Sequence, residues 1–166
     1  AGSCFTVTLI LKQQDTADPK PGGPPADGPL GAFGELSFDG KRVLLVEDNE
    51  LNREIAEEIL GTTGVIVESA VNGQEALNIF RDSPPGYYDL IFMDIQMPMM
   101  NGHEATRAIR ALPRPDASSV PIVAMSANAF TDDILASRES GMNEHITKPL
   151  DLGLLMSRLR YWLERA

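Results

Sequence analysis

The stretch that decides the fold is VLLVED, residues 43–48, in which four apolar residues run directly into two acids. A second run, LIFMD at residues 90–94, ends in the same way in Asp94. Short apolar runs separated by helical patterns are typical of strands buried on both faces of a parallel sheet. Since parallel strands all point one way, we expect the carboxylates of Glu47, Asp48 and Asp94 to meet at one edge of that sheet.

Two further apolar runs end in groups that complement these acids. PIVAMS at 121–126 ends in the hydroxyl of Ser126, and HITKP at 145–149 carries the ammonium of Lys148. The whole pattern predicts strands at about 42–47, 65–69, 89–94, 121–126 and 144–147. It predicts helices at about 50–61, 72–83, 102–112, 128–140 and 151–165. Five alternating units of this kind predict an α/β fold, a doubly wound five-stranded parallel sheet.

The predicted cluster is one of carboxylates, a hydroxyl and one ammonium. Three carboxylates held together repel one another, and a bound divalent cation relieves that repulsion. Because the donors are oxygens and no His or Cys adjoins them, we expect a hard ion, Mg²⁺ or Mn²⁺. Lys148 brings one positive charge and is placed to bind an incoming anion. Together these groups make a site for transferring a phosphoryl group onto a carboxylate.

Composition excludes several classes of partner. The 166 residues carry 14 basic and 24 acidic side chains, a formal charge of −10, with no Lys/Arg cluster, so we expect no nucleic acid to bind. The single cysteine, Cys4, cannot form an internal disulfide, which is compatible with a reducing, cytoplasmic setting. No apolar run reaches membrane-spanning length and the N-terminus lacks a signal-peptide pattern, so no direct membrane contact by this fragment is expected.

Four segments of this chain carry a family resemblance: VLLVEDNELNR (43–53), DLIFMDIQMPMMNG (89–102), PIVAMSANA (121–129) and GMNEHITKPL (141–150). They resemble the receiver domain of two-component response regulators, above all the C-terminal receiver of hybrid sensor histidine kinases. The resemblance implies a flavodoxin-like sheet with strand order 2-1-3-4-5. In that order the first and third strands flank the topological switch point where such folds bind ligands.

The resemblance also implies a role for each residue of the acidic cluster. Asp94 would be the phosphoacceptor, although a strand-terminal Asp can equally cap a turn. Asp48, Asp94 and the backbone carbonyl of Gln96 would ligate Mg²⁺, with Glu47 acting through a water molecule. Lys148 would contact the Asp94 carboxylate and then the phosphoryl oxygens.

Further roles follow for residues around the cluster. Ser126 would donate its hydroxyl to the phosphoryl group, and its plainer interpretation is a helix-start signal. His145 stands where the family usually has an aromatic switch residue; it is bulky enough to switch and polar enough to stay outside. Asn49, Asn52 and Pro149 would dock a histidine phosphotransfer protein, and the Lys148–Pro149 peptide is expected to be cis.

The first forty residues divide into two segments, which precede a predicted receiver domain at 41–166. Residues 12–40 are rich in Pro and Gly and are expected to form a linker. Residues 1–11 read as one strand, which resembles the last strand of a kinase ATP-binding domain. A cloning remnant, Ala1-Gly2-Ser3, followed by unrelated sequence is an equal alternative.

The leading hypothesis is a phosphorelay receiver from a hybrid histidine kinase, itself capable at most of autodephosphorylation. Its donor would be a histidine kinase domain in the same or another chain, its recipient a histidine phosphotransfer protein, and its location cytoplasmic even where the parent kinase is membrane-anchored. A pseudo-receiver that binds partners without phosphorylation is an alternative, as is a free-standing response regulator. A metal-dependent phosphatase would need a second acid where Gln96 stands.

Overall fold

A computed structural model describes residues 37–127, 131–149 and 151–165. The expected strand at 1–11, most of the expected linker at 12–40, and the expected helix start at 128 lie outside the described residues. Phe38, near the end of that linker, packs against the core, and its N–H donates to the carbonyl of Thr63 at 2.8 Å. Within the described part of the chain, no helix has the length and apolarity needed to cross a membrane.

Five parallel strands form one sheet in the order β2-β1-β3-β4-β5, which confirms the doubly wound, flavodoxin-like topology. Their bounds are β1 Arg42–Val46, β2 Ile66–Ala70, β3 Leu90–Asp94, β4 Ile122–Ser126 and β5 Glu144–Thr147. The second, third and fourth strands each start one residue later than predicted. In register, Val46 of β1 lies opposite Met93 of β3, and Asp94 lies opposite Met125 of β4. The carboxyl ends of β1, β3 and β4 are therefore level with one another.

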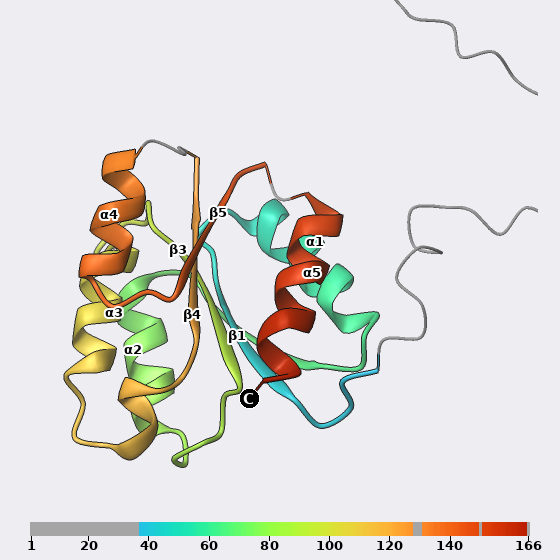
Figure 1. The fold of residues 1–166 in the computed structure, drawn as a ribbon, viewed down its shortest axis with the longest axis horizontal. Coiled ribbons are helices and arrows are strands. Elements are labelled where there is room, and N and C mark those ends of the chain that lie inside the picture. The colour runs from blue at the N-terminus through green and yellow to red at the C-terminus, as the bar shows by residue number, and fades with distance from the viewer. Residues whose placement is uncertain (1–36, 128–130, 150, 166) are drawn as a thin grey trace, which may run out of the picture. The chain divides into compact units, whose positions relative to one another are not determined.

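Helices cover both faces of the sheet (Figure 1). They are α1 Glu50–Gly61, α2 Gly73–Asp82, α3 Gly102–Arg110, α4 Thr131–Glu139 and α5 Leu152–Leu163. In Figure 1, α2, α3 and α4 lie on one side of the sheet, and α1 and α5 on the other. Alternate residues of each strand feed two separate cores: Leu44 and Ile91 join the core under α2 and α3, whereas Leu45 and Phe92 join the core under α1 and α5.

Side-chain caps start the helices at the edge where the strands end. The side chains of Asn49, Asn72, Asn101 and Asp151 each accept a backbone N–H in the first turn of α1, α2, α3 and α5. Asn101 forms a full capping box with Glu104. Such caps satisfy N–H groups that the helix itself leaves unpaired, each contributing about 1 kcal/mol. They anchor the loops that carry the predicted site.

An arginine on α3 fixes the approach to β5. Arg110 donates from Nη1 to the carbonyls of Ala117 and Val120, both at 2.8 Å, and from Nε to the carbonyl of Gly141 at 3.0 Å. Its Nη2 reaches Asn143 Oδ1 at 2.9 Å. The chain that enters β5 is thereby held in place, which sets the position of the residues that β5 presents to the site.

Candidate functional site

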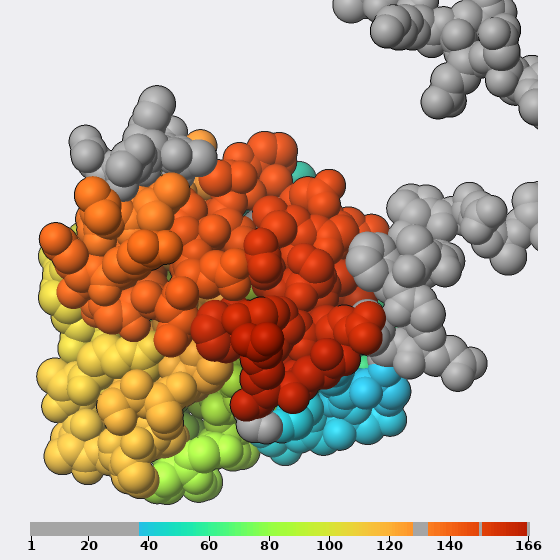
Figure 2. Space-filling view, in the orientation of Figure 1, coloured from blue at the N-terminus to red at the C-terminus, as the bar shows by residue number. Residues whose placement is uncertain are grey.

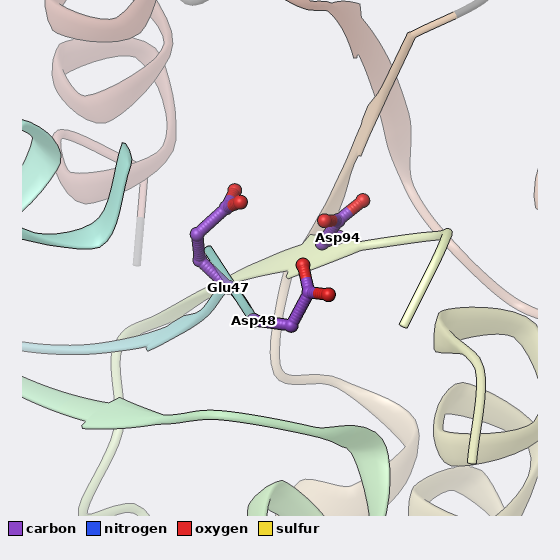
Figure 3. Close-up of side chains that lie close together, drawn as sticks. All are labelled: Glu47, Asp48 and Asp94. Carbon is purple, nitrogen blue, oxygen red and sulfur yellow. The ribbon is translucent and has the colours of Figure 1, made fainter. Parts of the chain in front are cut away.

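The three predicted acids come together at the carboxyl ends of β1 and β3. Glu47 and Asp48 directly follow β1, Asp94 is the last residue of β3, and these two strands are neighbours. One carboxylate oxygen from each lies within 4.8 Å of the others. Figure 3 shows Asp48 and Asp94 turned toward the same space, with Glu47 beside them. Glu47 and Asp94 are buried and Asp48 is exposed, so the cluster opens toward solvent on the Asp48 side.

Lys148 reaches this cluster from the far edge of the sheet. Its Nζ lies 2.6 Å from Asp94 Oδ2 and 2.5 Å from Glu47 Oε2. Lys148 is the first residue after β5, and its backbone N–H donates to the carbonyl of Ser126. The Lys148–Pro149 peptide is cis, as expected. Since β4 separates β5 from β3, this side chain spans the end of β4 to reach Asp94.

The environment shifts the pKa values of the paired groups. Burial raises the pKa of Asp94; the hydrogen bond and charge of Lys148 and the N–H of Gln96 oppose this, Glu47 adds to it, and the pKa remains above its usual value. Burial disfavours the Lys148 ammonium, but hydrogen bonds and charge from Asp94 and Glu47 outweigh that cost, so its pKa is raised. The ammonium therefore stays charged and is shared by two buried acids.

The donor set fits a hard divalent cation. Three carboxylates face one ammonium, which leaves a surplus of negative charge, and all of the acidic donors are oxygens. Both oxygens of Glu47 are already engaged, because Oε1 accepts from Asn52 Nδ2 at 3.2 Å and Oε2 meets Lys148. Asp94 Oδ1 accepts the N–H of Gln96 at 3.1 Å. Asp94 Oδ2 meets Lys148, so both oxygens of Asp94 are engaged as well, and the exposed Asp48 is the acid best placed to turn an oxygen toward an ion.

Ser126 and His145 are in direct contact beside the cluster. Ser126 is the buried last residue of β4, and its Oγ lies 2.8 Å from His145 Nε2. The other ring nitrogen, Nδ1, lies 3.2 Å from the Oγ of Ser137 on α4. The imidazole is thus half-buried rather than left in solvent. The sequence did not indicate Ser137, because the local pattern around a serine in a helix does not show which strand side chain it contacts.

The three predicted docking residues lie around α1, and two of them also serve the fold. Asn49 caps α1 by accepting the N–H of Asn52 at 3.0 Å, and Asn52 itself hydrogen-bonds Glu47. Pro149 lines a shallow pocket with Asn52, Ile55 and Lys148. Beside it, α1 exposes Ile55 to 48% and Leu51 to 64%.

Arg53 is a further residue that the sequence analysis missed. Its Nη1 donates to the backbone carbonyl of Glu47 at 3.1 Å, so the first turn of α1 is tied back to the end of β1. The contact shows that Arg53 also helps to orient the acid pair.

The family model of the response regulator receiver domain matches residues 43–160. The chain therefore belongs to the response regulator receiver family, the receiving component of two-component signal transduction. The acidic cluster of Glu47, Asp48 and Asp94 lies within the matched residues.

Curated relatives include kinases and small regulators. Probable histidine kinase 2 of rice, Oryza sativa subsp. indica, is 41% identical over 125 residues, which cover 69% of this chain and 12% of the kinase. The two-component response regulator ORR41 of Oryza sativa subsp. japonica is 41% identical over 124 residues, covering 72% of this chain and 94% of the regulator. The chain thus spans a small part of the kinase and nearly all of the regulator.

Two solved receiver domains resemble the fold closely. One belongs to the sensor histidine kinase PA1611 of Pseudomonas aeruginosa PAO1 and has a magnesium ion coordinated in its active site cleft; it is 34% identical, with a TM-score of 0.67 over 75% of this chain and 98% of that chain. The other is the receiver domain of Ssk1 from Saccharomyces cerevisiae, solved together with the histidine phosphotransfer protein Ypd1. It is 34% identical, with a TM-score of 0.67 over 75% of this chain and 90% of that chain.

Proposed function

We propose that this chain is a phosphorelay receiver that accepts a phosphoryl group from a phosphohistidine onto Asp94. The observation that carries the proposal is the buried contact of Lys148 with Asp94 inside a cluster of three carboxylates. A structural ion pair needs one acid for one ammonium, whereas a surplus of acids at the ends of neighbouring strands suits a site for a cation and an anion together. The magnesium in the PA1611 receiver supports the same interpretation.

Asp48 and Asp94, with the backbone carbonyl of Gln96, would hold Mg²⁺, and Mn²⁺ would fit the same donors. When bound, the ion would neutralise negative charge on the phosphoryl oxygens and on the acids around them. Glu47 would act through a water molecule, because its own oxygens are engaged by Asn52 and Lys148.

In the transfer step a carboxylate oxygen of Asp94 forms a bond to phosphorus as the bond from phosphorus to the donor imidazole nitrogen breaks. The imidazole nitrogen leaves with that electron pair and takes up a proton from solvent, which gives neutral imidazole. Lys148 lies at Asp94 Oδ2 before transfer, so a short movement of its Nζ would bring it onto a phosphoryl oxygen. The Ser126 hydroxyl, from the adjoining strand end, would donate to a second oxygen. The contributions of the chain are positioning and charge compensation.

The recipient we propose is a histidine phosphotransfer protein. The pocket at Asn52, Ile55, Lys148 and Pro149 adjoins the acidic cluster, and the apolar side chains of α1 next to it are exposed. A four-helix partner needs such an apolar contact beside its phosphohistidine. The complex of Ypd1 with the Ssk1 receiver supports a partner of this kind. Donor kinases use ATP, so the cytoplasm is the location that we propose.

Two parent proteins fit the domain, and each has an observation in its favour. The rice histidine kinase favours a receiver within a hybrid kinase, which is the origin we propose. The likeness to ORR41, which extends over 94% of that regulator, favours a free-standing regulator instead. Reading the gene upstream of Ala1 separates them: a histidine-bearing helical hairpin followed by ATP-binding motifs indicates the hybrid kinase.

Acetyl phosphate with Mg²⁺ tests the acceptor. Intact-mass analysis should show one acid-stable, base-labile phosphoryl group on the wild type and none on Asp94→Asn. Asp89→Asn is the matched control, because Asp89 is also a paired carboxylate but meets Lys41 before the start of β3. Labelling of Asp94→Asn to the wild-type level would overturn the assignment. A wild type that takes no label from acetyl phosphate or from a phosphorylated phosphotransfer protein would be a pseudo-receiver.

A further inference from the structure

The inner side of α4 is held by hydroxyl groups. Ser137 is 1% exposed and Ser140, directly after the helix, is 3% exposed, whereas the apolar Leu135 is 50% exposed. By contrast, α3 buries Ala105 and Ile109 in the core. Figure 2 shows α4 in orange as a surface layer next to α5 in red. Among the described residues of α4, none belongs to either apolar core, and buried hydroxyls hold this side by directional hydrogen bonds. A change in hydrogen bonding can therefore shift the position of α4 at low cost.

A chain of hydrogen bonds connects α4 to the proposed phosphorylation site. Ser126 Oγ lies 2.8 Å from His145 Nε2, His145 Nδ1 lies 3.2 Å from Ser137 Oγ, and Ser137 Oγ lies 2.9 Å from the carbonyl oxygen of Asp133. This series of hydrogen bonds thus runs from the end of β4 through β5 into α4. The imidazole is its central member.

The donor and acceptor of each hydrogen bond in this series can be assigned. A carbonyl oxygen can only accept, so the single hydroxyl proton of Ser137 points to Asp133. Nδ1 of His145 must then carry a proton and donate it to Ser137 Oγ. In a neutral imidazole the other nitrogen, Nε2, is an acceptor, and the Ser126 hydroxyl donates to it. All three hydrogen bonds therefore point from Ser126 and His145 toward α4.

Phosphorylation of Asp94 conflicts with that direction. Ser126 has one hydroxyl proton, and in the proposed function that proton goes to a phosphoryl oxygen. The lone pairs of Ser126 Oγ would then face the lone pair of Nε2 across 2.8 Å, which is repulsive. The repulsion ends when the imidazole proton leaves Nδ1 and, through solvent, arrives at Nε2. Nδ1 becomes an acceptor, and Ser137 turns its proton away from Asp133 toward it.

We propose that His145 is a positioning residue that transmits phosphorylation of Asp94 to α4 by reversing its tautomer, so that the two hydrogen bonds linking Ser126, His145 and Ser137 reverse together. The number of protons and the net charge stay the same throughout. The α4 end loses the Ser137–Asp133 bond, and Ser137 changes from acceptor to donor in its existing bond to His145 of β5. This inference rests on the proposed function, because the phosphoryl group on Asp94 is what claims the Ser126 proton.

Nitrogen-15 NMR of the two histidines tests the reversal, because protonated and unprotonated ring nitrogens have well-separated shifts. At about pH 8 the free protein should show Nε2 of His145 unprotonated and Nδ1 protonated, as the direction of the hydrogen bonds requires. Adding beryllofluoride and Mg²⁺, which mimic the phosphoryl group, should exchange the two. His103, whose Nδ1 lies 3.3 Å from Ser140 Oγ and does not contact Ser126 or Ser137 in this chain of bonds, should keep its pattern and serves as the internal reference.

Separate readouts distinguish failure of the relay from failure of the function. Fluorine NMR reports whether the mimic is bound, and Asp94→Asn should abolish that binding. If the mimic binds and the His145 nitrogens do not exchange, the relay is wrong and the phosphoacceptor assignment stands. If the mimic does not bind the wild type, both proposals fail. A free protein with both His145 nitrogens protonated, or with Nε2 protonated, also overturns the relay.

Two single-hydroxyl variants sharpen the test. Ser137→Ala removes the group that fixes the imidazole proton on Nδ1, so the free protein should show a mixture of tautomers. The variant should bind the mimic as the wild type does, yet lose most of the amide shift changes in α4. Ser140→Ala is the matched control, because it deletes an equally buried hydroxyl one turn away that contacts His103. The control should behave like wild type, and equal behaviour of the two variants would contradict the proposal.

Discussion

A Cβ atom on Gly102 would lie 2.2 Å from the backbone carbonyl oxygen of Asp94, so the first residue of α3 sits directly against the proposed phosphoacceptor. The other close atoms, Asp94 C and Ile95 Cα at 3.0 Å, also belong to the backbone, and Gly102 N–H donates to the carbonyl of Ile95. The loop between β3 and α3 is thereby folded back onto the end of β3. Only a residue without a Cβ permits this approach.

Gly102→Ala should therefore strain the end of β3. Because no side-chain movement can relieve the contact, we expect a loss of about 2 kcal/mol in the free energy of unfolding, measured by urea denaturation, and slower phosphoryl uptake by Asp94. Gly61→Ala is the control: it is helical, nothing lies within 4 Å of its Cβ position, and it should stabilise the protein by about 0.5 kcal/mol. Equal effects of the two substitutions would contradict the close approach at Asp94.

Lys148→Met keeps the length of the side chain and removes its charge. Glu47 and Asp94 would then be buried acids without their shared cation, and we expect the protein without metal to lose about 3 kcal/mol of stability. Mg²⁺ should restore part of that loss. Lys41→Met removes the more exposed ion pair to Asp89, where about 0.5 kcal/mol is expected. A Lys148→Met protein as stable as the Lys41→Met protein would show that the buried acids do not need the ammonium.

Asp48→Asn tests the repulsion within the acidic cluster. Without metal the variant should be more stable than wild type, because one of three adjacent negative charges is gone. At 100 times the dissociation constant, Mg²⁺ should stabilise the wild type by about 2.7 kcal/mol through mass action, and the variant much less. Thermal denaturation with and without Mg²⁺ measures both effects. An undiminished metal response in the variant would remove Asp48 from the ligands.

Because of the buried phenol of Tyr88, the free energy of unfolding should fall in alkali. Burial, with a hydrogen bond to Glu68, raises the pKa of its phenol far above the usual value, so the folded chain keeps a proton that the unfolded chain loses near pH 10. Stability should fall there by about 1.4 kcal/mol per pH unit from this group. Tyr88→Phe should remove that part of the slope and cost about 1 kcal/mol at neutral pH. Tyr161→Phe, which removes the hydroxyl of a more exposed ring on α5, is the matched control.

The fold was predictable because its strands carry an unusually clear pattern. In β3 and β4 every residue is buried, so each strand appears in the sequence as a continuous apolar run, and its end is marked by Asp94 or Ser126. The second strand, predicted at 65–69, lies at residues 66–70, and there exposed Ile66 and Glu68 alternate with more buried neighbours instead of forming a continuous apolar run. Periodicity is weaker in such a strand, and its boundary is less certain.

The acidic cluster was predictable from the same logic, because parallel strands carry their last residues to one edge. Once the strands were assigned, Glu47, Asp48 and Asp94 had to share one edge of the sheet, and the strand order implied by the family resemblance made β1 and β3 neighbours. The direction of the Lys148 side chain followed from a resemblance to a known family and not from the residues alone. Contacts made by long side chains across several elements, such as the four hydrogen bonds of Arg110, left no trace in local sequence.

Local sequence thus determined which residues form strands and that the three acids share one edge of the sheet, since both depend on neighbours along the chain and on strand direction. Tertiary structure alone decided that His145 lies between Ser126 and Ser137, and that Glu47 is shared by Asn52 and Lys148. Those contacts depend on the distance between β5 and α4 and on side-chain rotamers in a packed interior. A hydrogen bond tolerates only a few tenths of an ångström, so strand order can bring its partners together but cannot select them.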